Sequence, residues 1–188
     1  MEILRVIVTG TTGAGKTSFV RAVSEIEVIR SKLLAADSTD SQKQSMSTLD
    51  FGRLTFDDRQ MLKLYGIPGD PQLDFMWDIL VRRAHACIVL MDAHRPQDFR
   101  LTRRIVSNLK RRSRVPMIVG LTHADCPDAW SIANAELALG LTSEQYCSPV
   151  VIVNATQPES VLRSLLILTH EMINAPDQNR MPLTLAQR

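Results

Sequence analysis

Gly10-Thr11-Thr12-Gly13-Ala14-Gly15-Lys16-Thr17 is the stretch that decides the fold of this chain. An apolar, β-branched run at residues 3–8 precedes it, and a segment with helical spacing of apolar residues, Phe19 to Ile26, follows it. This order of strand, G-x-x-x-x-G-K-[ST] and helix is that of a phosphate-binding loop. We therefore predict that residues 10–18 hold the phosphates of a nucleoside triphosphate.

Each residue type in this loop has a physical reason to be there. Glycines let the backbone bend so that successive N–H groups point inward and surround an anion. The helix that begins at about Gly15 directs its positive N-terminal dipole at the same phosphates. Lys16 can reach the β- and γ-phosphates, and the Thr17 hydroxyl can complete the shell of a Mg²⁺ ion. The nucleotide-binding residues predicted here are Gly10, Thr11, Thr12, Gly13, Ala14, Gly15, Lys16, Thr17 and Ser18.

Composition sets the limits for this prediction. At 188 residues, 45% hydrophobic and 22% charged, the chain has the size and make-up of one soluble globular domain. A net charge of +2 is too small to indicate a nucleic-acid partner. No apolar run reaches the roughly 18–20 residues of a transmembrane segment. Three cysteines without a C-x-x-C pair, Cys87, Cys126 and Cys147, favour a reduced, cytoplasmic location.

Strands and helices are expected to alternate after the loop. Residues 31–47 are polar and favour a mobile loop, whose position suggests a nucleotide-sensing switch. Residues 49–56 and 60–65 flank a short polar turn and predict a hairpin. Further strands are predicted at 86–91, 115–121 and 150–153, and helices at 73–81, 97–112, 130–139 and 158–175. The pattern predicts an α/β, three-layer P-loop domain with a mostly parallel six-stranded sheet and one antiparallel edge strand. The domain covers 1–175, and 176–188 are a tail.

Two surface features leave alternatives open. In helix 73–81, Phe75, Met76 and Ile79 cannot share the face of Trp77, so they either pack on a neighbouring helix or form a partner surface. Residues 95–114 contain eight Arg or Lys against one acidic residue. Such a run is usually a solvated helix face, and the functional alternatives are contact with an acidic protein or with anionic lipid headgroups. Without interleaved aromatic residues, nucleic acid ranks lower.

Several loops that follow strands carry chemistry. They contain Gly66 and Gly69, then Thr122, His123 and Asp125, then Asn154, Ala155 and Thr156. Ligands bind along the carboxyl edge of such sheets, so these residues are expected to meet the loop at 10–17.

The order of phosphate loop, polar switch, x-x-P-G loop, T-H-A-D and N-A-T resembles a Ras-type small GTPase over residues 1–175. The D-F-G-R strand at 50–53, the G-x-P-G loop at 66–69 and the F-M-W-D helix at 75–78 are most similar to a bacterial branch. Its members are the MglA-type gliding-motility GTPases and the actinobacterial conservon GTPases. The resemblance implies a Ras-like G domain and a GTP/GDP switch that uses Mg²⁺. It also implies a regulator of roadblock/longin type on the switch segments 31–48 and 66–80.

The base-reading loop departs from the usual N-K-x-D of this superfamily. Asp125 can accept hydrogen bonds from guanine N1–H and N2–H₂, each of about 1.5–3 kcal/mol, which favours guanine by about 10²–10⁴. Thr122 in place of Asn is expected to weaken the brace within the loop. His123 in place of Lys loses a stem that covers the base, and it either stacks on the base or touches nothing. Ala155 can offer its N–H to guanine O6.

The hydrolysis site departs further. Gly66 replaces the Asp of D-x-x-G, which supports Mg²⁺ through a water in this superfamily, so metal affinity is expected to fall. Gly69 still offers an N–H to a γ-phosphate. Asp70 stands where many relatives carry a water-orienting Gln, and Gln72 is a substitute. The predicted catalytic residues are Lys16, Asp70 and Gln72, with slow or partner-dependent hydrolysis. The predicted metal ligands are Thr17 and, among Ser45, Ser47 and Thr48, preferably Thr48.

Two other functions remain open from the sequence. One is a nucleotide-binding scaffold without turnover, which Gly66 and Asp70 favour. The other is a P-loop kinase for a small molecule. Asp125 and Ala155 argue against it, because both residues are suited to binding guanine. The nucleotide that purifies with the chain separates the kinase from the other two.

Overall fold

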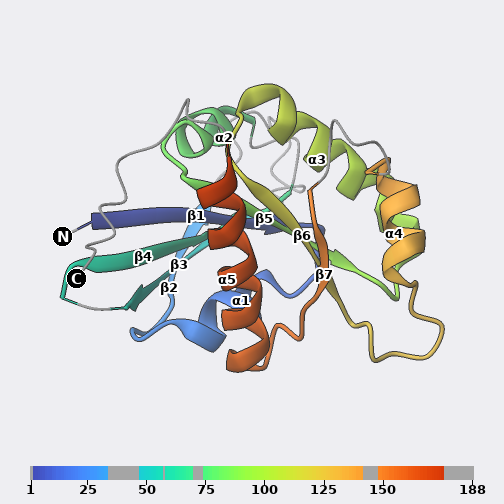
Figure 1. The fold of residues 1–188 in the computed structure, drawn as a ribbon, viewed down its shortest axis with the longest axis horizontal. Coiled ribbons are helices and arrows are strands. Elements are labelled where there is room, and N and C mark those ends of the chain that lie inside the picture. Colours follow the sequence, from blue (N-terminus) through green and yellow to red (C-terminus); the bar gives the residue numbers. More distant parts are fainter. Residues whose placement is uncertain (1, 34–46, 57, 70–73, 142–147, 176–188) are drawn as a thin grey trace, which may run out of the picture.

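A computed structural model describes residues 2–33, 47–56, 58–69, 74–141 and 148–175. Within these ranges seven strands form one sheet in the order β2-β3-β4-β1-β5-β6-β7, with β2 and β7 at opposite ends (Figure 1). The strands are β1 Glu2–Gly10, β2 Ile29–Leu33, β3 Ser47–Thr55, β4 Gln60–Gly66, β5 Ala86–Asp92, β6 Met117–Thr122 and β7 Val150–Ile152.

Helices cover both faces of this sheet (Figure 1). They are α1 Lys16–Val23, α2 Asp74–Val81, α3 Phe99–Arg112, α4 Ile132–Leu139 and α5 Pro158–Asn174, with a short 3₁₀ turn η2 at Pro96–Asp98. Alternation along β5 separates the two cores. Ile88 packs with α1 and α5, whereas Val89 packs with α2, α3 and α4. The predicted three-layer α/β architecture is confirmed. None of the described helices has the length and apolarity to cross a bilayer.

The central strand β5 is buried along its whole length, as its unbroken apolar run predicts. Cys87 lies within it, and burial raises the pKa of its thiol to about 12. A thiol with so high a pKa stays protonated and packs as a small apolar group.

The sheet contains one strand more than predicted. Residues 31–33, expected to open the polar loop, belong to β2, which pairs antiparallel with β3. Since β3 also pairs antiparallel with β4, the antiparallel pairings of this mostly parallel sheet lie at one edge, with β2 outermost. β2 carries two charged residues, Arg30 and Lys32, and charged side chains of this kind suit an exposed edge strand. Residues 34–46 of the predicted switch lie outside the described residues.

Two helices differ from their predicted apolar faces. α1 ends at Val23 because Ser24 has extended backbone, so Ile26 lies beyond the helix. For α5, helical spacing in the sequence predicts an apolar stripe of Leu162, Leu165, Leu166, Met172 and Ile173. The buried apolar residues are instead Val161, Leu165 and Leu168, and Leu162 and Leu166 are exposed. Apolar residues surround much of α5, so helical spacing permits either face. Packing against α1 and the sheet selects one of them.

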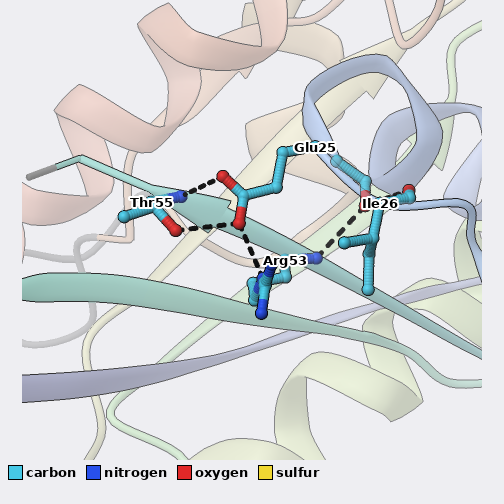
Figure 2. A network of polar contacts seen from close by, with 5 residues as sticks. Glu25, Ile26, Arg53 and Thr55 are labelled. Atoms are coloured by element: carbon cyan, nitrogen blue, oxygen red, sulfur yellow. Dashed lines mark hydrogen bonds and ion pairs between the residues drawn. The ribbon is translucent and has the colours of Figure 1, made fainter.

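A polar network fixes β3 to the end of α1 (Figure 2). The Glu25 carboxylate accepts hydrogen bonds from Arg53 Nε at 2.6 Å, from Thr55 N at 3.1 Å and from Thr55 Oγ1 at 2.8 Å. Ser24 Oγ donates to Ile26 O and accepts from Arg53 N. This network holds the C-terminal end of β3 beside the end of the helix that carries Lys16 and Thr17.

We predict that Glu25→Gln lowers the stability of the chain at neutral pH and that the difference from wild type disappears in acid. Hydrogen bonds from the Thr55 side chain are the largest cause that lowers the pKa of Glu25 from its ordinary 4.5. A carboxylate whose folded-state pKa is lowered stabilises the fold above its unfolded pKa. That contribution is lost as pH falls below 4.5 and through the folded-state value. Urea unfolding at several pH values measures it.

The matched control is Glu27→Gln, an exposed glutamate two residues away that lies outside this network. A stability difference for Glu25→Gln that is the same at pH 7 and pH 3 would contradict the prediction.

Candidate functional site

The loop at 10–15 has a backbone that requires glycine. Gly10, Gly13 and Gly15 have φ of 141°, 85° and 91°. A Cβ built on Gly10 would lie 2.1 Å from the carbonyl oxygen of Leu90, so no side chain fits there. The loop therefore lies close to β5, and α1 begins directly after it. This is the strand, loop and helix arrangement that the sequence predicts for an anion site.

Lys16 lies at the centre of this loop. Its Nζ donates to Gly10 O at 3.0 Å and to Thr11 O at 2.7 Å. Burial lowers the pKa of its ammonium to about 8, and the charge of Asp50 opposes that shift. An ammonium group has three N–H donors, so one of them remains for an anion held by the loop.

Asp50 of β3 is the acidic residue that contacts Thr17, and no function was predicted for it from the sequence. Its Oδ2 accepts a hydrogen bond from the Thr17 hydroxyl, and its side chain is only 4% exposed. Its Oδ1 lies 3.3 Å from Arg30 Nε, an ion-pair distance, yet it accepts no well-aligned hydrogen bond. A buried carboxylate oxygen without a hydrogen bond is costly, so this atom is available to a further cation.

Asp50 occupies the space that a side chain at residue 66 would fill. The two residues pair directly across β3 and β4. A Cβ built on Gly66 would lie 3.1 Å from the Cβ of Asp50 and 3.6 Å from its Oδ2. The sequence analysis expected a missing carboxylate at Gly66. In the fold, a carboxylate from the neighbouring strand lies at this place instead.

The rest of the D-F-G-R strand supports this position. Phe51 packs against Tyr65 with ring centroids 5.3 Å apart. A Cβ on Gly52 would lie 2.6 Å from Val20 Cγ1, so β3 lies directly on α1. Arg53 belongs to the Glu25 network (Figure 2). Three neighbours of Asp50 in the chain therefore hold it beside Thr17.

The loop after β4 lies against the phosphate loop. Ile67 N donates to Val8 O at 2.8 Å. A Cβ on Gly69 would lie 2.8 Å from Gly10 O and 2.4 Å from Ile105 Cδ1. Only a glycine fits at 69 in this arrangement. Its backbone lies next to the phosphate loop, where its N–H was predicted to contact a γ-phosphate.

Thr122 connects the base-reading loop to the phosphate loop. Its hydroxyl lies 3.2 Å from both Ala14 O and Met91 O, and its single proton serves one of them at a time. The hydroxyl therefore links β6 to residue 14 directly. The expected weakening of the brace within the loop stays a prediction. The adjacent loop also closes on residue 15, since a Cβ on Gly15 would lie 3.0 Å from Ala155 Cβ.

Asn154 holds the last loop in shape. Its side-chain oxygen accepts from Thr156 N at 3.1 Å and from Thr156 Oγ1 at 2.7 Å, while its own N donates to Ser160 Oγ. This turn leaves Ala155 buried beside the phosphate loop. The role of the Ala155 N–H as a donor to a base stays a prediction.

His123 has a defined partner. It adopts a φ of 55°, and its Nδ1 lies 3.4 Å from Oδ1 of Asp92 at the end of β5. The alternative that His123 touches nothing is therefore wrong. Asp125 is exposed two residues further on, and its role in binding a base stays a prediction.

Two predicted catalytic residues, Asp70 and Gln72, lie outside the described residues. Thr48 is exposed on β3, two positions before Asp50, and Asp50 is the β3 residue that contacts Thr17. Thr12 is exposed at the tip of the loop, and Ser18 is half-buried on α1.

Sequence reasoning missed Asp50 and Arg95. Asp50 could have been found as the charged residue that the hairpin register sets opposite Gly66. Arg95 was counted in the basic region 95–114, but it precedes η2 and α3, and its guanidinium lies against Gly13. No spacing rule predicts that contact, because 82 positions separate the two residues in the chain.

Comparison with known proteins gives a match in structure alone. No family model matches the chain, and no curated protein is similar to it. Among solved structures, the Arl6 (BBS3) small GTPase from Trypanosoma brucei, with the nucleotide analogue GppNp bound, superposes with a TM-score of 0.69. The match covers 93% of this chain and 99% of that one at 15% sequence identity. The chain has the fold of a Ras-like small GTPase.

Proposed function

We propose that this chain binds GTP and GDP and acts as a molecular switch. One observation carries the proposal: the loops at 10–17, 66–69, 122–125 and 154–156 meet at one edge of the sheet. Thr122 joins two of them through its contact with Ala14 O. Such a site takes phosphates at one end, through Lys16 and the loop amides, and a base at the other.

Guanine is the base that this site suits. The Asp125 carboxylate accepts from the two N–H groups on one edge of guanine, and adenine has neither donor there. The Ala155 N–H, held by the Asn154 turn, serves guanine O6. The donor and acceptor pattern of these two residues is therefore complementary to guanine.

Mg²⁺ fits the residues at the phosphate end. Hydroxyl and carboxylate oxygens are the ligands that Mg²⁺ takes beside nucleotide phosphates. Thr17 would hold it directly, and Asp50, with its Oδ1 free of a hydrogen bond, would hold it through water. A bound Mg²⁺ neutralises charge on the phosphates. Thr48 stays a candidate for the switch hydroxyl.

We predict that Asp50→Asn reduces Mg²⁺ affinity of the nucleotide complex by about 10- to 100-fold, the usual cost of losing an outer-shell carboxylate. Calorimetric titration of GDP at varied Mg²⁺ measures it, with GDP binding in EDTA close to wild type. Asp58→Asn, the same change at an exposed position of the same hairpin, is the control.

A double variant sharpens this test. Asp50→Gly combined with Gly66→Asp returns the carboxylate to the other strand, into space that the Asp50 side chain vacates. Recovery of the Mg²⁺ dependence in the double variant is the expected result. If Asp50→Asn loses as much GDP affinity in EDTA as it does with Mg²⁺, the proposal that Asp50 holds Mg²⁺ is contradicted.

Hydrolysis is proposed to be slow or partner-dependent, with Lys16 and either Asp70 or Gln72 near the γ-phosphate. The switch segments 31–48 and 66–80 would change with the nucleotide, and a roadblock/longin-type regulator would bind them, as in the MglA and conservon branch. Ile79 on α2 is 57% exposed and is available to such a partner. Single-turnover phosphate release with and without the regulator tests this, and near-zero rates in both would reject hydrolysis.

A non-hydrolysing scaffold is the second candidate, favoured by Asp70 in place of a water-orienting amide. Comparing the structure with GDP bound and with a GTP analogue bound separates the switch from the scaffold, because a scaffold has the same structure with both.

The remaining proposals are a G domain over 1–175 with a tail at 176–188, a cytoplasmic location, and contact of the basic 95–114 region with anionic lipid.

The nucleotide retained on purification is the direct test of the proposed function. We expect guanine nucleotide, mostly GDP, released by denaturation and identified by chromatography. Adenine nucleotide in its place would reject the guanine assignment and return the P-loop kinase as the better reading.

A further inference from the structure

Arg95 lies in a rigid turn between β5 and α3. Its N donates to Asp92 O at 3.2 Å, and its carbonyl accepts from Asp98 N at 3.0 Å. Pro96 follows it and restricts its backbone. Ala93 N donates to Thr122 O at 2.9 Å, so this turn is also tied to the base-reading loop. The Arg95 side chain therefore leaves a well-defined position beside the site.

The guanidinium of Arg95 lies on the phosphate loop. A Cβ built on Gly13 would be 3.1 Å from its Nη1, 3.6 Å from Cζ and 3.9 Å from Nη2. All three atoms belong to the planar group, so the whole group borders Gly13. Glycine at 13 leaves the space that the guanidinium occupies.

Asp92 links this cation to the base-reading loop. Its side chain is 6% exposed, with Oδ2 at 3.5 Å from Arg95 Nε and Oδ1 at 3.4 Å from His123 Nδ1. Its Oδ1 also accepts from His94 N at 2.9 Å. Arg95 and His123 are therefore held on the two oxygens of one buried carboxylate, and each keeps about half of its surface exposed.

We propose that Arg95 covers the sugar and base of the bound nucleotide, with Asp92 as its positioning residue. The inference rests on the proposed function, which puts phosphates at 10–17 and the base at Asp125. A group that borders Gly13 and shares Asp92 with His123 lies between those two ends. His123 replaces a longer Lys and contacts Asp92, so it covers less of the base. The long side chain of Arg95 would cover the face of the base that this Lys covers in the superfamily.

Arginine suits this task for reasons of shape and charge. Its planar guanidinium stacks on aromatic rings and has five N–H donors, of which the Asp92 contact uses one. Its charge is partly balanced by Asp92, so it does not act as a free phosphate-binding cation. The expected interaction is with the face of the base and the ribose oxygens.

The test compares ligands that all carry phosphate groups but differ in whether they also carry a sugar and a base. Wild type and Arg95→Ala are titrated with GTP, GDP, GMP and inorganic tripolyphosphate, with weak ligands measured by displacement. Arg95→Ala is expected to weaken the three nucleotides by the same factor, about 2- to 30-fold. Tripolyphosphate, which has no sugar or base, is expected to bind both proteins alike. Arg95→Lys should recover little, because lysine restores the charge without the plane.

Controls separate a binding role from a folding role. Arg95→Gln keeps a donor for Asp92, and thermal unfolding without nucleotide checks that both variants fold. Arg100→Ala removes one exposed positive charge from α3 and should bind every ligand as wild type does. Unchanged nucleotide affinity in folded Arg95→Ala, a loss that grows from GMP to GTP, or full rescue by lysine would each overturn the proposal.

Failure of the proposed function gives a different result. If wild type prefers ATP to GTP, guanine recognition is rejected, and the same variants titrated with ATP, ADP and AMP still decide the role of Arg95. If wild type binds no nucleotide, both proposals are overturned together.

Discussion

Asp125→Asn is expected to reduce GTP affinity by about 10²–10⁴, because guanine N1–H and N2–H₂ each lose a charged acceptor worth about 1.5–3 kcal/mol. The same variant should gain affinity for xanthosine triphosphate. Xanthine has a carbonyl in place of the 2-amino group, and the new side-chain amide can donate to it. Competitive titration of the two nucleotides against labelled GDP measures both effects.

The matched control is Asp128→Asn, the same change three residues along the loop. Asp128 is exposed and has a φ of 62°, a conformation that asparagine tolerates. It should bind both nucleotides as wild type does. If Asp125→Asn holds GTP as firmly as the parent chain and gains nothing for xanthosine triphosphate, the guanine assignment fails.

Lys16→Met is expected to reduce affinity for GTP and GDP by about 10²–10⁴. The wild-type ammonium is held by Gly10 O and Thr11 O at the centre of the loop. Contacts with the β- and γ-phosphates are charge-assisted, and each is worth about 1.5–3 kcal/mol. Calorimetric titration of GTP and GDP measures the loss, which should be larger for GTP if the γ-phosphate is contacted.

Folding is not expected to suffer in this variant. The ammonium is largely buried, and methionine removes the cost of burying a charge while it keeps the length of the side chain. Cooperative thermal unfolding of the nucleotide-free protein checks this. Lys63→Met, a change of the same kind on β4 away from the loop, is the control. Nucleotide affinity within a few-fold of wild type for Lys16→Met would remove the phosphate site on which the proposed function depends.

Local sequence signals determined much of this protein. The glycines, Lys16 and Thr17 after an apolar strand predict a strand, a glycine loop and a helix, and the structure has all three. The buried run at 86–91 and the hairpin at 49–65 predict β5, β3 and β4, because period, length and turn residues are properties of short segments. The layer architecture follows from the alternation of these elements.

Contacts between segments that are distant in the sequence could not be predicted from local sequence patterns. The buried face of α5 depends on which of two apolar sides meets α1 and the sheet. β2 exists as a strand because β3 offers a free edge, and its own polar residues favour a loop. Both outcomes are decided by a partner that is distant in sequence.

The sequence by itself predicted a nucleotide-binding edge and identified the loops that meet there. Only the tertiary structure decided which side chains complete it. Asp50 reaches Thr17 because hairpin register sets it opposite Gly66, and Arg95 reaches Gly13 because β1 and β5 are neighbours in the sheet. The physical reason is that motifs record spacing along one segment, whereas a carboxylate or a guanidinium can be supplied from any strand that the fold brings alongside.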